Sequence, residues 1–180
     1  ELGWATNPLT FIEIDQNIAI KKESISSTNT NSNSRIIQTY THTIRWRLSQ
    51  NLSNETGFRF DTGIGDFNVW TWQSGIEYLV NNSSISLTGG NGFRYPTFND
   101  LYWEPGGNAS LLPEKTNWAR IHLNAQLKDH QLSVQLSSKQ SRNLIQWVPG
   151  ESYWQPQNIA KTRRNTLTFT FGGRLIKIIN

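Results

Sequence analysis

The sequence predicts an all-β protein, an antiparallel up-and-down meander of about eight strands. Apolar and polar residues alternate with a period of two along most of the chain, which is typical of strands with two different faces. Clusters of Gly, Asn, Asp and Ser interrupt the alternation at intervals and predict turns. No apolar run approaches the roughly 20 residues that a membrane helix needs. Any crossing of a membrane would therefore be made by strands.

The first two strands are predicted over residues 9–23 and 35–49. The second has the clearest alternation, with its apolar face formed by Ile36, Tyr40, Ile44, Trp46 and Leu48. Between the two strands lies a low-complexity polar tract, residues 24–34, with the sequence SISSTNTNSNS. Such a tract buries too little apolar surface to become ordered, so it predicts a flexible loop.

Three further strands are predicted over residues 55–64, 69–80 and 84–93. A short turn at residues 50–54 precedes the first of them. A longer connection at 63–68 and a tight two-residue hairpin turn at Asn81-Asn82 separate the three strands from one another. Within the last of these strands, Gly89-Gly90 predicts a bulge or a bend, because glycine interrupts side-chain packing.

The second half of the chain continues the meander. Strands are predicted within residues 119–127 and 132–137, with a turn at Asp129-His130 between them. A connection at residues 148–153 leads to a last extended region. There Leu167, Phe169 and Phe171 alternate with threonines before Gly172-Gly173.

The longest connection, residues 94–116, joins two strands of one sheet. Three prolines and the pair Gly106-Gly107 fit a long ordered loop, because they fix or reverse the backbone. Disorder is disfavoured by a dense set of large side chains: Phe93, Tyr95, Phe98, Leu101, Tyr102, Trp103, Leu111 and Leu112. We expect the first part of this loop to fold against the rim of the sheet and the part around Trp103 to be exposed to a ligand.

The connections alternate between long and short, so the predicted meander has one long-loop end and one short-turn end. Outer-membrane barrels have this asymmetry, although soluble barrels such as lipocalins also mix loop lengths. The polar face is rich in Ser, Thr, Asn, Gln and Gly, which suits a hydrated lumen. Aromatic residues gather near predicted strand ends, where an interfacial girdle would place them: Trp46, Trp70, Trp72, Tyr78, Phe93, Trp118 and Trp147.

A barrel with a hydrated lumen fixes the expected direction of each face. We expect one set of side chains in the strand after the long loop to face away from the barrel axis: Ile121, Leu123, Ala125 and Leu127. The alternate set would face the lumen: Arg120, His122, Asn124 and Gln126.

A length of 180 residues suits one domain or a piece of a larger one, and we expect residues 1–180 to form a single β-barrel segment. Only 36% of the residues are hydrophobic while 12% are aromatic, which suits strands with one polar and one apolar face. The absence of cysteine excludes disulfides and thiolate metal sites. The net charge of +4 is scattered and no RNP-like motif is present, so no nucleic-acid partner is expected. The chain begins at Glu1 and contains no Met, which suggests a processed protein or a fragment.

No catalytic motif is apparent. A nucleophile elbow, a P-loop and a dinucleotide fingerprint are all missing, and the three histidines have no metal-ligand spacing. Asp100 and Glu104 flank Leu101-Tyr102-Trp103, but both lie in one loop, so structural capping or loop hydrogen bonding is expected rather than glycosidase chemistry. We therefore expect no enzyme activity, no cofactor and no metal site.

Residues 92–115 carry a motif that resembles TonB-dependent outer-membrane receptors, especially those of the vitamin B12 (cobalamin) type. The motif begins with a strand that ends in Gly92, Phe93 and Arg94. It continues with Pro96, Thr97, Phe98, Asn99, Asp100, Leu101 and Tyr102. It closes with Gly107-Asn108 and then with Leu112, Pro113, Glu114 and Lys115. The resemblance extends roughly over residues 70–163 and includes Gln157 to Lys161.

This resemblance implies a segment of an outer-membrane barrel of about 22 strands with a plug in its lumen. The implied function is import of a large, scarce ligand, cobalamin or siderophore-like, with energy transmitted from the TonB complex through a plug domain that this chain lacks. Outer-membrane lipid would be the other partner. The alternative is a self-contained eight-stranded barrel, either a small outer-membrane protein or a soluble lipocalin-like ligand binder. The tail after Phe171, GGRLIKIIN, departs from the aromatic residue that ends the last strand of such barrels.

The candidate ligand-binding residues lie in the connections at the long-loop end, with residues 92–116 on the extracellular side. Exposed aromatic residues in loops usually contact a ligand or a partner. The candidates are Tyr102, Trp103, Glu104, Trp147, Tyr153 and Trp154. The alternative is that these aromatic side chains pack the loops against each other.

Overall fold

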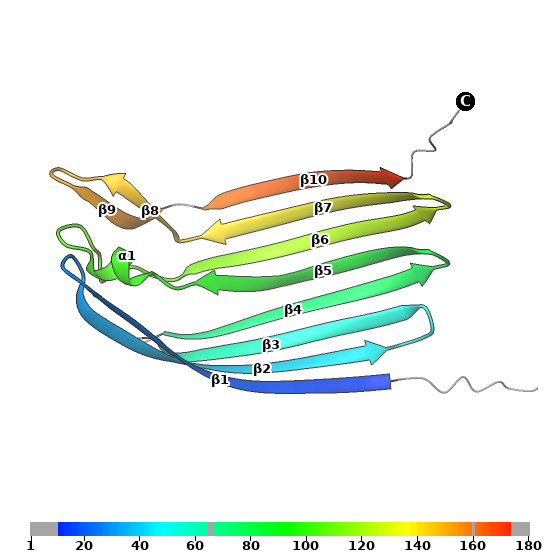
Figure 1. Cartoon of the computed structure of the whole chain (residues 1–180), viewed down its shortest axis with the longest axis horizontal. Helices are drawn as coiled ribbons and strands as arrows, with labels where there is room; N and C mark the ends of the chain where they lie inside the picture. Colours follow the sequence, from blue (N-terminus) through cyan, green and yellow to red (C-terminus); the bar gives the residue numbers. More distant parts are fainter. Residues whose placement is uncertain (1–10, 65–66, 160, 174–180) are drawn as a thin grey trace, which may run out of the picture.

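The structure is a computed structural model that describes residues 11–64, 67–159 and 161–173. Its main feature is an eight-stranded antiparallel sheet with the strand order β1-β2-β3-β4-β5-β6-β7-β10 (Figure 1). The strands of this sheet are β1 (Phe11–Ser27), β2 (Asn31–Arg47), β3 (Leu52–Ile64), β4 (Phe67–Val80), β5 (Ser83–Arg94), β6 (Glu114–Leu127), β7 (His130–Arg142) and β10 (Thr162–Gly173). The predicted meander of about eight strands is confirmed.

One face of this sheet is apolar across all eight strands. Cross-strand pairing places Tyr40 beside Phe60 and Phe60 beside Trp70, with ring centroids 6.2 and 4.5 Å apart. Farther along the sheet, Ile85 on β5 pairs directly with Leu123 on β6. Directly paired residues share a face, so these pairs join into one continuous surface.

This apolar face is exposed. The buried hydrophobic residues of the described chain are Ile37 in the first half of β2, Leu111 shortly before β6, and Ile145 shortly after β7. The side chains of Leu123 and Trp70 are 43% and 67% exposed. A sheet that leaves its large apolar side chains uncovered has no hydrophobic core of its own.

The opposite face is polar. On β1 to β3, Arg45 pairs across the strands with Glu13 and Glu55, and its guanidinium also binds Asp15. These side chains are about half exposed, so the ion pairs contribute little to stability on their own. Their consequence is a hydrophilic surface on this side of the sheet.

The connections gather at two ends as the meander predicts. The tight turns after β2, β4 and β6 lie at one end, and helix α1 (Phe98–Tyr102) lies at the other (Figure 1). Asn81 has a φ of 52° in the β4–β5 turn, a left-handed conformation that asparagine tolerates. The β6–β7 turn lies at Lys128-Asp129, one residue earlier than predicted, and His130 already begins β7.

The polar tract at residues 24–34 is not a flexible loop, so that prediction was wrong. β1 continues to Ser27 and β2 begins at Asn31, with unbroken pairing between them. The turn is closed by a 2.8 Å hydrogen bond between the hydroxyls of Ser27 and Thr30, and Thr30 is fully buried. Backbone pairing and hydroxyl contacts order a segment that apolar burial alone could not order.

The predicted bulge at Gly89-Gly90 is also absent. The pairing of β5 with β6 runs through both glycines without a shift in register, while its pairing with β4 ends at Gly90. The irregularity lies in β3 instead, between Asp61 and Ile64, where Gly63 has a φ of 88°. Glycine is suited to this conformation because it has no Cβ.

The long connection is shorter than predicted and contains a helix. β5 extends to Arg94 and β6 begins at Glu114, so the connection covers residues 95–113 and includes α1. No helix among the described residues is long and apolar enough to cross a membrane. A second, two-stranded sheet that the sequence did not predict follows β7, formed by β8 (Leu144–Pro149) and β9 (Trp154–Ile159).

Candidate functional site

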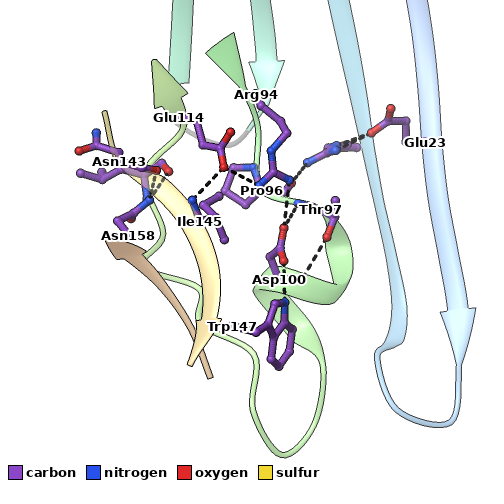
Figure 2. Close-up of polar contacts among 12 residues, drawn as sticks. Glu23, Arg94, Pro96, Thr97, Asp100, Glu114, Asn143, Ile145, Trp147 and Asn158 are labelled. Atoms are coloured by element: carbon purple, nitrogen blue, oxygen red, sulfur yellow. Dashed lines mark hydrogen bonds and ion pairs between the residues drawn. The ribbon is translucent and has the colours of Figure 1, made fainter. Parts of the chain in front are cut away.

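Three segments that are far apart in the sequence meet at the loop end of the sheet. They are the tip of the β1–β2 hairpin, the connection at residues 95–113, and the β8–β9 hairpin. Figure 2 shows α1 lying between the other two segments, with Arg94, Asp100 and Glu114 pointing toward one another.

Asp100 is the centre of this arrangement. Its carboxylate accepts a hydrogen bond from the backbone N–H of Thr97 at 2.9 Å, and its own N–H donates to the Thr97 hydroxyl at 3.1 Å. These two bonds form a capping box at the start of α1. The indole N–H of Trp147 on β8 donates to the other carboxylate oxygen at 3.1 Å (Figure 2). The expected capping role of Asp100 is confirmed, and the same side chain joins α1 to the β8–β9 hairpin.

Arg94 and Glu114 extend this network into the main sheet. The Arg94 guanidinium lies 2.6 Å from the Glu114 carboxylate and 3.7 Å from that of Asp100. Glu114 is buried and also accepts a 2.8 Å hydrogen bond from the backbone N–H of Ile145. A carboxylate with two charge-assisted or backbone donors is well compensated for its burial. The pair therefore connects the end of β5, the start of β6 and the start of β8.

Asn158 fixes the β8–β9 hairpin from the other strand. Its side-chain amide donates to the carbonyl oxygens of Leu112 at 2.9 Å and Asn143 at 2.8 Å, and its oxygen accepts from the N–H of Leu112 at 2.8 Å. Leu111, the residue before Leu112, is 2% exposed. The hairpin is thus held by a full set of amide hydrogen bonds beside a buried leucine.

Arg35 connects the β1–β2 hairpin to the same loop. It pairs with Glu23 at 2.6 Å, donates to the carbonyl oxygen of Pro96 at 3.0 Å, and lies 4.7 Å from the centre of the Phe98 ring. The backbone N–H of Glu104 donates to the carbonyl oxygen of Asn29 at 2.7 Å. The polar tip of the hairpin is therefore a docking partner of the long connection.

Tyr95 lies at the start of this connection in a half-buried position. Its ring packs edge-on against Phe93 with centroids 4.6 Å apart, and its buried hydroxyl has no hydrogen-bond partner among the described residues. Burial disfavours the phenolate, and the nearby Asp61 carboxylate adds to this effect. Together they raise the pKa of Tyr95 to about 12.

The six predicted ligand-binding residues fall into two groups. Tyr102, Trp103, Tyr153 and Trp154 are between 37% and 59% exposed at the outermost loops. Trp147 is half-buried with its indole N–H bound to Asp100. Glu104 is exposed, and its carboxylate accepts a 3.2 Å hydrogen bond from the side-chain amide of Asn31.

Two of the aromatic-bearing loops are in direct contact. A Cβ added to Gly106 would lie 2.3 Å from the carbonyl oxygen of Trp154 and 3.3 Å from the Trp147 ring. A side chain at position 106 could not fit between the backbones. The turn after Trp103 and the start of β9 therefore form one surface.

The motif residues of the predicted loop mainly build the scaffold that holds together the β1–β2 tip, the connection at residues 95–113 and the β8–β9 hairpin. Pro96, Pro113 and Glu114 are buried, whereas Phe93, Phe98 and Leu101 are half-buried. Gly92 and Arg94 belong to β5, while Thr97 and Asn99 are exposed at the start of α1. The first part of the loop is thus folded against the sheet as expected.

Two residues of the scaffold, Arg35 and Asn158, were not predicted from the sequence. Asn158 lies in the run from Gln157 to Lys161 that belongs to the family resemblance, so a signal was available for it. For Arg35, which follows the low-complexity tract, no local pattern pointed to Pro96 and Phe98.

The chain is similar to known proteins in both sequence and fold. Residues 6–175 match the family described as TonB dependent receptor-like, beta-barrel. A curated relative, the vitamin B12 transporter BtuB of Vibrio vulnificus (strain YJ016), is 33% identical over 101 residues, which cover 55% of this chain and 16% of the relative. The chain therefore spans about a sixth of the length of that relative.

Two solved structures have a similar fold. The siderophore receptor PirA from Pseudomonas aeruginosa superimposes with a TM-score of 0.81 at 13% identity, covering 91% of this chain and 34% of that one. The Serratia marcescens hemophore receptor HasR, in complex with its hemophore HasA and heme, gives a TM-score of 0.74 at 12% identity. That match covers 89% of this chain and 36% of HasR. At these identities the similarity concerns the fold alone.

Proposed function

The chain belongs to the TonB-dependent receptor-like β-barrel family, and from this premise we propose that it forms part of the wall of an outer-membrane receptor that imports a large, scarce ligand. The observation that carries the proposal is the eight-stranded sheet with one continuous apolar face and with docked loops at one end. In an outer-membrane barrel such a face meets lipid and the longer loops lie outside the cell. Other parts of the receptor would supply the remaining strands and the plug domain that contacts the TonB complex.

Cobalamin is the first candidate ligand. The curated relatives that match this chain at about 30% identity are named vitamin B12 transporters. The siderophore and hemophore receptors are similar at 12–13% identity, which supports the same fold but carries less weight for the ligand. A siderophore-like ligand is therefore the second candidate.

The ligand would first meet the aromatic surface of the outermost loops. Tyr102, Trp103, Tyr153 and Trp154 present large rings there, and aromatic rings contribute much of the binding energy at buried contacts. Trp147 and Glu104 lie in the same loops as these residues and are held by hydrogen bonds to Asp100 and Asn31 respectively. Residues 92–116 would then lie on the extracellular side of the barrel, with α1 as their rigid part.

A self-contained eight-stranded barrel is less well supported. Closure of such a barrel requires the first and last strands to pair. Within the described residues, β1 pairs with β2 and β10 pairs with β7, so β1 and β10 are the two edges of an open sheet. Those edges suit a segment whose neighbours are further strands of a larger barrel.

Substitution of Trp103 tests the binding role of the aromatic surface. In the full-length receptor we expect Trp103→Ala to weaken cyanocobalamin binding by about tenfold or more without changing the unfolding temperature, because Trp103 is exposed. Phe98→Ala is the matched control. Phe98 packs against Arg35, so this substitution should lower the unfolding temperature and affect binding indirectly. Normal binding combined with early unfolding in Trp103→Ala would mean that Trp103 serves packing.

Uptake measurements test the function itself. Cells that produce the receptor should accumulate labelled cyanocobalamin, or failing that a ferric siderophore, only when TonB is present. Accumulation equal to that of receptor-free cells for cyanocobalamin, ferric enterobactin and heme would contradict the proposed function.

A further inference from the structure

We propose that the polar face of β6, β7 and β10 carries an anion-binding site formed by Arg120, Lys139 and Arg164. The group that it takes is a phosphate or carboxylate of the imported molecule. This inference rests on the proposed function, since it identifies a second contact for the same ligand, on the wall of the lumen below the loops.

Strand register places the three cations on one face. Arg120 pairs with Ser137, which pairs with Thr166. Two residues away along each strand, Trp118 pairs with Lys139, which pairs with Arg164. Side chains in directly paired positions, and at every second position along a strand, point to the same side of a sheet. The cations thus occupy two neighbouring rows that cross three strands.

These rows line a hollow of about 510 Å³. Besides the three cations, its walls include Trp118 and the hydroxyl-bearing residues Thr116 and Thr166. Arg94 and Glu114 close the end of the hollow nearest the loops. The same Arg94 contacts Asp100 of the loop network, so the hollow begins directly beneath the candidate ligand-binding surface.

The cations lack counter-charges within the described part of the chain. Arg35, Arg45, Arg59 and Arg94 all form ion pairs there, whereas Arg120, Lys139 and Arg164 form none. Lys139 lies directly opposite Arg164, and like charges in directly opposite positions of a sheet repel each other. An anion bound between them would relieve this repulsion.

The polar face is also divided by charge. Its β1–β4 part is nearly balanced, because its carboxylates alternate with cations, many of them ion-paired: Glu13, Asp15, Glu23, Glu55, Asp61 and Glu77 against Lys21, Arg35, Arg45, Arg47 and Arg59. Its β6–β10 part carries the three cations and a single carboxylate, Glu114, which already binds Arg94. An anionic group is therefore attracted to the β6–β10 side of the lumen wall, where the excess of positive charge lies, more than to the nearly balanced β1–β4 side.

The side chains present suit an oxyanion. Guanidinium groups donate two parallel hydrogen bonds to a carboxylate or phosphate, and an ammonium adds a point charge. The Arg120 guanidinium carbon lies 5.8 Å from the centre of the Trp118 ring, a cation–π contact that limits its orientations. The neighbouring Thr and Ser hydroxyls can donate further hydrogen bonds.

Anion titration of the full-length receptor in detergent micelles tests this site. We expect citrate and pyrophosphate to bind in isothermal titration calorimetry at low ionic strength, and more weakly as NaCl screens the charges. The triple variant Arg120→Gln, Lys139→Gln, Arg164→Gln should lose about tenfold or more of this affinity. Arg163→Gln is the matched control: Arg163 is the neighbour of Arg164 on the opposite face, and its removal should leave anion binding unchanged.

Two results would overturn the inference. One is equal citrate and pyrophosphate affinity in the wild-type receptor and the triple variant. The other is no anion binding to the wild type together with a lower unfolding temperature of the triple variant, which would identify an acidic segment of the receptor as the occupant. Either result leaves the proposed function standing if TonB-dependent uptake is retained, whereas loss of all uptake would count against the proposed function itself.

Discussion

Asp100 joins two loops through one carboxylate. One oxygen accepts from the backbone of Thr97 and the other from the indole of Trp147, while the Arg94 guanidinium lies 3.7 Å away. The capping role was predictable because Thr97 and Asp100 have the spacing of a capping box. The bond to Trp147 was not predictable, because it joins residues 47 positions apart on different elements.

Replacement of Asp100 should open both loops. We expect Asp100→Ala to cost about 1–3 kcal/mol of local stability, since it removes a helix cap and leaves the Trp147 N–H without its acceptor. Hydrogen exchange should then become faster in residues 95–113 and 144–159. Asp129→Ala, in the turn at the opposite end of the sheet, is the control and should leave both segments protected. Unchanged exchange in the β8–β9 hairpin would mean that the Trp147 bond does not hold it.

Tyr95 should ionise at a higher pH than an unperturbed tyrosine. Its folded pKa of about 12 lies above the unfolded value of about 10. The stabilising contribution of its neutral form is therefore complete below pH 10 and is lost as the pH rises toward 12. The difference in absorbance at 295 nm between the wild type and Tyr95→Phe measures this step directly.

The same variant tests the unpaired hydroxyl. Because the buried Tyr95 oxygen has no hydrogen-bond partner among the described residues, Tyr95→Phe should be neutral or stabilising in thermal unfolding. A marked loss of stability would show that the hydroxyl has a partner in the intact receptor.

At the scale of elements, the β1–β2 hairpin shows how a polar segment becomes ordered. Residues 24–34 contain a single apolar residue, Ile25, yet they are paired to the tip and docked on the long connection. Their order comes from backbone pairing and from contacts such as that of Arg35 with Pro96. Composition alone describes neither contribution.

The β8–β9 hairpin depends on docking because an isolated two-stranded hairpin is only marginally stable in water. Asn158→Ala removes three hydrogen bonds to Leu112 and Asn143, so we expect the hairpin to detach and its exchange protection to fall. Gln157→Ala, at the exposed neighbouring position on β9, is the matched control. Equal protection in the two variants would mean that apolar contacts around Leu111 hold the hairpin instead.

On the scale of the whole molecule, the sheet is organised around two faces and has no enclosed core. Large apolar side chains on one face are exposed from β1 to β10, and within the described residues only Ile37, Leu111 and Ile145 are buried hydrophobic residues. Such a sheet is suited to a boundary between lipid and a hydrated lumen.

A charge placed on the apolar face should be costly in a bilayer. We expect Leu123→Arg to lower the free energy of unfolding in phosphatidylcholine vesicles by about 2–4 kcal/mol if the position is near the midplane, and by less near an interface. Gln135→Arg is the control: Gln135 follows Val134, the cross-strand partner of Leu123, and lies on the polar face. If the control were the more damaging variant, the polar face would be the one that meets lipid.

The sequence by itself determined the eight-stranded meander, its two faces, its two unlike ends and the hydrogen-bonding role of Asp100 within the loop. Alternation, turn residues and capping pairs are local patterns, so they can be read from residues close together in the chain. Only the tertiary structure decided that the β1–β2 tip, α1 and the β8–β9 hairpin form one scaffold. It also decided that Arg120, Lys139 and Arg164 share one hollow. The deciding contacts join distant residues, such as Arg35 with Pro96 and Asn31 with Glu104, which are 61 and 73 positions apart. Their formation depends on strand register and loop docking, which no local pattern records.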